Sequence, residues 1–133
     1  MSLEQNYAAM VDALKKPGRE ISITITPDRA DLIHMAMGIS GEAGEFLDCV
    51  KKYVIYNKPW DHENAIEELG DLEFFLEGVR QLTGISRKMV LEHNMKKLSA
   101  RYKDKVYSDE QAQARADKNI NRGADDAEFG MKP

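Results

Sequence analysis

The sequence predicts an all-α protein, built as an antiparallel helical bundle. Apolar residues recur with helical spacing in three long segments, residues 27–56, 63–82 and 87–103. Glycine, proline and asparagine mark the breaks between these segments. A single short stretch alternates as a strand does, and a lone strand has no sheet to join. Helices with one apolar face must therefore bury that face against one another.

The N-terminal part precedes the long helices. Residues 3–15 have an amphipathic pattern that predicts a short helix, and Pro17 and Gly18 end it. Residues 21–25 read ISITI, with apolar and polar residues in alternation. This stretch predicts a short strand or an extended arm. Such a strand either pairs with another chain or stays extended.

The first long helix begins at Thr26-Pro27, with threonine as the N-cap and proline at the first helical position. We expect it to run over residues 27–56 and to loosen at Gly38 and Gly41. Residues 57–62 predict a loop. A second helix over residues 63–82 carries an apolar stripe of Ile66, Leu69, Leu72, Leu76 and Val79.

The third long helix follows a break at Gly84. Ser86 is its expected N-cap, and its apolar stripe over residues 87–103 consists of Leu91, Met95, Leu98 and Tyr102. The polar tail after Tyr107 predicts one more helix over residues 109–118 and disorder from residue 119 onward. With 133 residues in all, we expect one domain over residues 1–107 and a C-terminal tail over residues 108–133.

The composition excludes several classes of function. The net charge of -4 disfavours non-specific binding to nucleic acid polymers and to anionic membranes. No run of apolar residues is long enough to span a membrane. Residues 1–12 lack the pattern of a signal peptide, and the single cysteine, Cys49, excludes an intramolecular disulfide. We therefore expect a cytoplasmic protein whose one thiol faces the core.

Four carboxylates are placed unusually. The apolar face of the first long helix consists of Met35, Ile39, Phe46, Cys49 and Tyr53. Glu42 of the stretch GEAGE falls in the middle of this face and Glu45 at its edge. Glu68 and Asp71, in EELGD, are also three residues apart and share one face of the second helix. Two antiparallel helices can therefore direct all four carboxylates into one space.

Four carboxylates in a partly apolar groove repel one another, so a cation is needed among them. Oxygen ligands favour Mg²⁺, with Mn²⁺ as the alternative. The histidines, His34, His62 and His93, do not join the pattern, which argues against zinc and a di-iron bundle, and we assign none of them a catalytic role. A single pair of carboxylates three residues apart is common on solvated helix faces, whereas two such pairs on consecutive helices favour a metal site.

Three motifs in order resemble the MazG-like superfamily of all-α nucleoside triphosphate pyrophosphohydrolases. The stretches GEAGE and EELGD are similar to its E-x-x-E and E-x-x-D signature. KKYVIYNKPWD at residues 51–61 and NMKKLSARY at residues 94–102 are similar to two further segments of its bacterial and phage members. The resemblance covers about residues 30–105. It departs in the tail, where Ala114-Arg115-Ala116 stands in place of Asn-Arg-Asp.

The resemblance implies a MazG-like bundle that hydrolyses (deoxy)nucleoside triphosphates between the α and β phosphates, giving a nucleoside monophosphate and pyrophosphate. It assigns metal binding to Glu42, Glu45, Glu68 and Asp71, and catalysis to Glu45 and Glu42, with Glu45 helping to deprotonate water. Further site residues are assigned to substrate binding: Asn94, Lys97 and Arg101 to the phosphates, Lys51, Lys52 and Lys58 as weaker phosphate contacts, and Trp60 to base stacking or to an interface.

Alternatives remain open. A dUTP or dCTP hydrolase, or a phosphoribosyl-ATP pyrophosphohydrolase, uses the same carboxylate pairs. A non-catalytic helical interaction module is the distant alternative.

We also expect a homo-oligomer, a dimer or a tetramer, because the apolar stripes of the long helices are too broad for one partner each, and we expect residues 21–25 to help at the interface.

Overall fold

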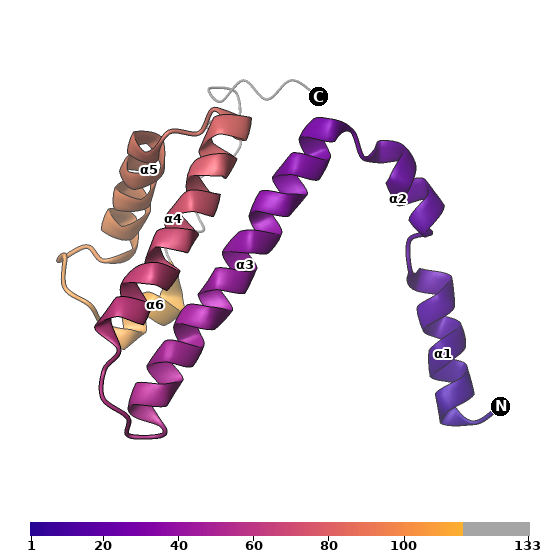
Figure 1. Cartoon of the computed structure of the whole chain (residues 1–133), viewed down its shortest axis with the longest axis horizontal. Coiled ribbons are helices and arrows are strands. Elements are labelled where there is room, and N and C mark those ends of the chain that lie inside the picture. Colours follow the sequence, from indigo (N-terminus) through magenta and orange to yellow (C-terminus); the bar gives the residue numbers. More distant parts are fainter. Residues whose placement is uncertain (116–133) are drawn as a thin grey trace. The chain divides into compact units, whose positions relative to one another are not determined.

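The computed structural model describes residues 1–115, and this part of the chain is helical, without a strand. It divides into two compact units, Met1–Gly84 and the chain from Ile85 onward. The helices are α1 (Leu3–Leu14), α2 (Gly18–Thr24), α3 (Pro27–Val54), α4 (His62–Thr83), α5 (Arg87–Arg101) and α6 (Asp109–Ala114) (Figure 1). The all-α class is confirmed, whereas the predicted division at residue 107 stays a prediction. None of these helices combines the length and the apolar character needed to cross a membrane.

Helix α1 follows the prediction closely. A capping box at Ser2 and Gln5 satisfies its first amides: the Gln5 amide donates to Ser2 Oγ over 3.2 Å, and the Ser2 amide donates to Gln5 Oε1 over 2.8 Å. Every residue of α1 is exposed. Its helical state therefore depends on local interactions within the described chain.

The stretch ISITI is helical, so the prediction of a strand or an extended arm is wrong. Its first four residues belong to α2, and Ile25 is the C-cap of that helix, so the backbone groups form local hydrogen bonds and need no partner strand. The Ser22 hydroxyl donates to the carbonyl of Arg19, and the Thr24 hydroxyl donates to that of Ile21, over 2.9 and 2.8 Å. Such side-chain bonds to the preceding turn make serine and threonine compatible with a short helix.

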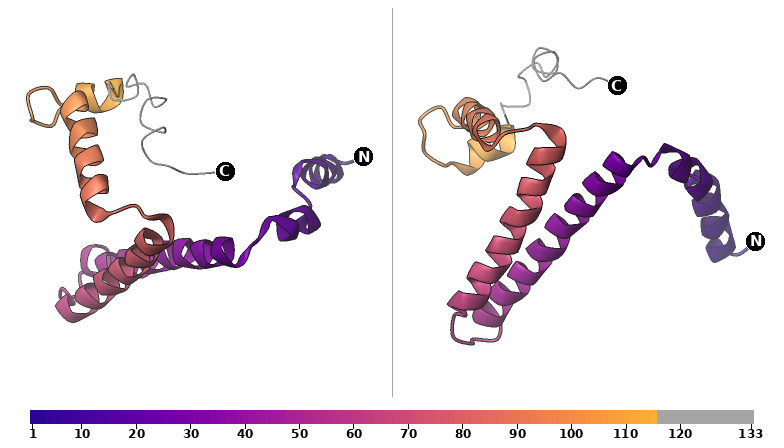
Figure 2. Two further views of the ribbon diagram at one scale, coloured as in Figure 1. Left: turned by 90° about the horizontal axis from the view of Figure 1, so that it is seen from above. Right: turned by 45° about the horizontal axis from the view of Figure 1, so that its top comes forward.

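Helices α3 and α4 form an antiparallel hairpin, and they lie side by side in all views (Figures 1 and 2). Thr26 and Asp61 cap their N-termini, and Gly84, with φ +73°, ends α4 in the left-handed conformation. Helix α3 runs without interruption through Gly38 and Gly41, so the predicted loosening is wrong. At Gly38 the ring of Phe75 occupies the space that a Cβ would need, and at Gly78 the side chain of Met35 does so. The two backbones therefore approach closely at these glycines.

The hairpin has an apolar side and a polar side. Each helix can be followed around its own axis, starting from the line along which the two helices touch. Because the helices are antiparallel, a rotation of the same sense on either helix moves toward the same side of the hairpin. On this basis the apolar side carries Leu32, Ala36, Ile39, Ala43, Leu47 and Val50 of α3 with Ile66, Leu69, Leu72 and Leu76 of α4. The polar side carries Gly41, Glu45, Asp48 and Lys52 of α3 with Glu63, Glu67 and Asp71 of α4.

Few side chains of the hairpin are fully buried. Within residues 1–115 the buried residues are Cys49, Ala65 and Glu68, so the predicted inward position of Cys49 is confirmed. Several residues of the predicted stripes are exposed instead: Ile66 is 58% exposed and Leu69 47%. The apolar side is therefore uncovered in the described chain.

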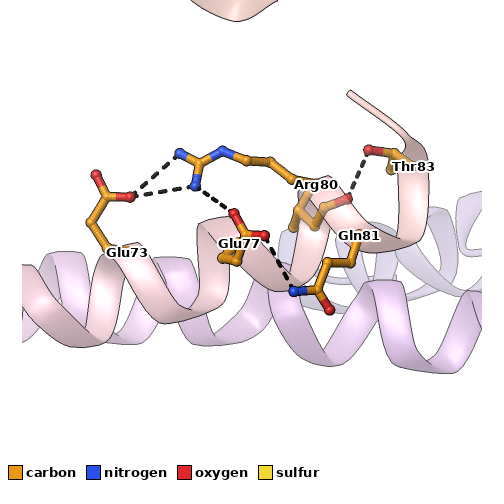
Figure 3. A network of polar contacts seen from close by, with 6 residues as sticks. Glu73, Glu77, Arg80, Gln81 and Thr83 are labelled. Carbon is orange, nitrogen blue, oxygen red and sulfur yellow. Dashed lines mark hydrogen bonds and ion pairs between the residues drawn. The ribbon is translucent and has the colours of Figure 1, made fainter. Parts of the chain in front are cut away.

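A polar network follows the outer surface of α4 (Figure 3). The Arg80 guanidinium donates to Glu73 Oε2 over 3.4 Å and to Glu77 Oε2 over 3.2 Å. Gln81 Nε2 donates to the other oxygen of Glu77 over 3.2 Å, and these donors lower the pKa of Glu77. The network spans two turns and stabilises the C-terminal half of α4.

The second unit contains α5 and α6. Ser86 caps α5 as predicted, since its hydroxyl accepts from the amide of Met89 over 3.2 Å. Helix α6 confirms the first part of the predicted helix over residues 109–118, and the prediction for residues 119–133 lies outside the described residues. An open groove of about 420 Å³ in this unit is lined by Met95, Leu98, Ser99, Tyr102, Lys105, Val106 and Tyr107.

Candidate metal centre

The close contact of α3 and α4 sets the register of their carboxylates. Four residues forward from Gly38 along α3 is Glu42, and four residues back from Phe75 along α4 is Asp71. Because a step of four residues returns to nearly the same helix face, Glu42 and Asp71 also face each other. Glu68, one turn before Asp71, shares this face. The glycine contact therefore positions the three acids.

Glu42, Glu68 and Asp71 converge in space. Each offers one carboxylate oxygen, and these three oxygens all lie within 4.8 Å of one another. Glu68 is 8% exposed, Glu42 is half-buried and Asp71 is exposed. Carboxylate oxygens at such separations fit a hard divalent cation, which brings its ligands to about 2.0–2.6 Å from its centre. Within residues 1–115 this is the group of metal-ligating side chains that meets the geometry.

The pKa values of the two glutamates follow from this crowding. Burial raises the pKa of Glu42 above its ordinary value of 4.5, and the charges of Glu45 and Asp71 raise it further. A hydrogen bond with the Glu68 carboxyl acts in the opposite direction. Burial also raises the pKa of Glu68, followed by repulsion from Glu45 and Glu42. Between pH 4.5 and the raised pKa values, and without a cation, the folded chain therefore holds more protons at this site than an unfolded chain does.

Glu45 lies outside the group of three. It is exposed, yet its charge raises the pKa values of both Glu42 and Glu68. Its position one turn after Glu42, toward the polar side, explains both facts. Of the four predicted metal ligands, the structure brings three together and leaves Glu45 beside them.

The lysines at the end of α3 are paired locally. Lys51 and Lys52 both form ion pairs with Asp48, the second at 2.9 Å, and their hydrogen bonds lower the pKa of Asp48 to about 2. The Lys51 ammonium also lies 5.9 Å from the centre of the Tyr56 ring. These contacts occupy the two lysines in the absence of a ligand, and a role in binding phosphate stays a prediction.

Trp60 contacts an aromatic ring of its own chain. Its ring centroid lies 5.6 Å from that of Tyr53 in an edge-to-face arrangement, which closes the loop between α3 and α4. Trp60 remains 41% exposed. His34 also packs edge-to-face, on Phe75 with ring centroids 6.2 Å apart, in agreement with a structural role.

Asn94, Lys97 and Arg101 lie on α5, in the second unit. Asn94 is exposed, and Lys97 and Arg101 are half-buried. None of them lines the groove of that unit. Their assignment to phosphate contacts stays a prediction.

Comparison of the chain with protein-family models, with curated proteins and with solved structures finds no match. The resemblance to MazG-like enzymes therefore rests on the sequence motifs alone.

Proposed function

We propose that this chain is a Mg²⁺-dependent or Mn²⁺-dependent hydrolase of nucleoside triphosphates, acting between the α and β phosphates. The observation that supports it most is the convergence of Glu42, Glu68 and Asp71 from two helices, with Glu68 buried. A buried carboxylate among further carboxylates is unfavourable unless a cation compensates it. The order and spacing of the MazG-like motifs supply the reaction class.

The residues of the site would have the following roles in catalysis. Glu42, Glu68 and Asp71 would hold the metal, which when bound would neutralise phosphate charge and lower the pKa of a water molecule. Glu45, exposed beside them, accepts the proton of the attacking water. The water oxygen forms a bond to phosphorus, the bridging bond between the α and β phosphates breaks, and pyrophosphate leaves. Asn94, Lys97 and Arg101 would balance the charge of the phosphates.

The proposal includes a homo-oligomer. The apolar side of the hairpin exposes large side chains of both helices, including Leu47 and Leu69, at 65% and 47%. A helix side that exposes several large apolar side chains is characteristic of an interaction surface. A second copy that presents the same side would complete a four-helix bundle. A cytoplasmic location fits both a nucleotide substrate and a single reduced cysteine.

A panel of ribonucleoside and deoxynucleoside triphosphates, with Mg²⁺ and separate detection of pyrophosphate and orthophosphate, tests the function. Release of pyrophosphate that chelation and Glu68→Gln both abolish supports it. Direct release of orthophosphate, or activity that Glu68→Gln retains, contradicts it. Inclusion of dUTP, dCTP and phosphoribosyl-ATP separates the related enzymes. Absence of metal binding and of hydrolysis leaves the non-catalytic interaction module.

A further inference from the structure

The second unit contains a groove that the proposed reaction does not use. Its lining comes from one face of α5 and from the connection between α5 and α6. Apart from Ser99 and Lys105 this lining is apolar or aromatic. The volume of the groove, about 420 Å³, lies within the range of ligand-binding sites. The groove is therefore a candidate binding surface in its own right.

Local contacts fix the shape of the groove. The Lys105 amide donates to the carbonyl of Tyr102 over 3.0 Å, and Lys105 adopts the left-handed conformation with φ 56°. The chain turns there, and the ring centroids of Tyr102 and Tyr107 lie 5.7 Å apart. The Lys103 amide also donates to Gln111 Oε1 over 3.2 Å, which attaches α6 to the end of α5. The groove is thus formed by neighbouring segments of one unit.

The surroundings of the groove are positively charged. Residues 87–105 contain seven lysines and arginines and two acids, whereas the whole chain has a net charge of -4. Lys105 lines the groove itself, and within the described chain its ammonium group forms no ion pair. This surface fits a ligand in which carboxylates stand beside an apolar or aromatic group.

The last residues of the chain have this chemistry. Residues 125–131 read DDAEFGM, so three acids are followed by Phe129 and Met131. The segment lies outside the described residues. Its acids complement the charge of residues 87–105, and its aromatic side chain complements the apolar lining of the groove.

The chain is long enough to bring this segment to the groove. The described part ends at Arg115, directly after α6, which is itself attached to the end of α5. Fourteen residues lead from Arg115 to Phe129. A chain of that length spans about 20 Å on average as a random coil and about 46 Å at full extension. The effective concentration of a segment tethered in this way is about millimolar, so even a weak interaction would keep the groove occupied.

We propose that the groove is the docking site of residues 125–131 of the same chain, with the Phe129 ring against Tyr102 and Tyr107 and the acids beside Lys105. The aromatic anchor supplies most of the affinity, and the acids set the orientation of the segment. This inference is independent of the proposed function, because neither a metal ion nor a nucleotide takes part.

The test compares the full chain with a shortened chain that ends at Ala124. A fluorescently labelled peptide of residues 121–133 is titrated with each chain, and its anisotropy is measured. The shortened chain is expected to bind the peptide, with an affinity that decreases as salt is added. The full chain is expected to bind at least about tenfold more weakly, because its own segment competes at about millimolar effective concentration. A Phe129→Ala peptide is expected to lose binding to the shortened chain by about tenfold.

Substitutions in the shortened chain locate the binding surface. Met95→Glu places a charge in the apolar lining, and Lys105→Glu reverses the charge beside it while the lining stays intact. Both are expected to weaken peptide binding about tenfold. Val90→Glu is the matched control, because Val90 is an exposed apolar residue of α5, at 50% against 68% for Met95, that does not line the groove. Circular dichroism checks that each variant is folded.

Every outcome is decisive. A shortened chain that does not bind the peptide, or a full chain that binds it equally well, overturns the proposal. Full binding by Met95→Glu and Lys105→Glu, or an equal loss in Val90→Glu, overturns the assignment to the groove. A sedimentation mass that falls when residues 125–133 are removed would place the segment on a second copy and overturn docking within one chain.

Discussion

Phe75 of α4 lies directly against Gly38 of α3, where its ring fills the space of a missing side chain. We predict that Gly38→Ala lowers the free energy of unfolding by about 1–2 kcal/mol, because overlap with the ring outweighs the better helix propensity of alanine. Urea denaturation measures this change. Phe75→Leu in the Gly38→Ala background should recover part of the loss, and a stability gain in Gly38→Ala would contradict the close contact.

Glu42 supplies a test of the metal centre through stability. Glu42→Gln keeps the shape of the side chain and removes a repelling charge, so the metal-free variant should melt at the same temperature as the metal-free parent or higher. Mg²⁺ at a hundredfold excess over its Kd should stabilise the parent by about 2.7 kcal/mol, and the variant should lose most of this gain. Thermal melts in chelator and in Mg²⁺ decide the matter. Equal destabilisation in both buffers would show that Glu42 has a structural role.

The raised pKa values of Glu42 and Glu68 predict a pH dependence of the metal-free protein. Between the ordinary value of 4.5 and the raised pKa, the folded chain holds more protons than the unfolded chain. Stability without metal should therefore fall as the pH rises through this window, and Glu68→Gln should reduce that fall. Added Mg²⁺ should oppose the fall, because the ion competes with protons for the carboxylates.

Melting temperatures in chelator, from about pH 4 to pH 8, measure this effect. Asp48 contributes with the opposite sign, since its pKa is lowered from 3.8 to about 2. The contribution of Asp48 is present above pH 3.8 and is lost below it, so the two effects separate along the pH axis. Parallel profiles for the parent and Glu68→Gln would refute the assignment.

The apolar side of the hairpin predicts which substitutions would disrupt the proposed oligomer. Leu47→Glu and Leu69→Glu place a charge on this side and should convert the proposed oligomer to a monomer. Met37→Glu is the control, because Met37 is as exposed as Leu47, at 68% against 65%, but lies away from the apolar side. Sedimentation at micromolar concentration measures the mass. A parent chain that is already monomeric would be incompatible with the proposed assembly.

Local signals in the sequence were sufficient for most helix ends. Thr26, Ser86 and Gly84 act through neighbouring residues only, and each was predicted in its observed role. The prediction for the stretch ISITI is wrong because alternation of apolar and polar residues does not include the local hydrogen bonds of Ser22 and Thr24. Periodicity describes which faces are apolar, and it does not include bonds to the preceding turn.

The candidate site was predictable as a set of acids, but not in its register. Spacing by three residues places Glu42 with Glu45 and Glu68 with Asp71 on any helix. Which of the four meet depends on how far one helix is shifted along the other, and the contact of Gly38 with Phe75 determines this shift. The sequence carries no comparable signal for a contact between residues so far apart. Glu45 was therefore expected inside the group and lies beside it.

The complete exposure of α1 has a consequence for its amide protons. A helix of about this length is marginal in water unless other elements bury one of its faces. The capping box at Ser2 reduces fraying at the N-terminal end of α1. The last turn at the C-terminal end contains no basic residue that would interact with the free carbonyl groups. Deuterium should therefore enter the amides of α1 at rates set by a local helix–coil equilibrium. The amides around Cys49 and Ala65 should exchange only when α3 separates from α4. Hydrogen exchange would therefore distinguish a fast-exchanging α1 from a slowly exchanging α3–α4 hairpin.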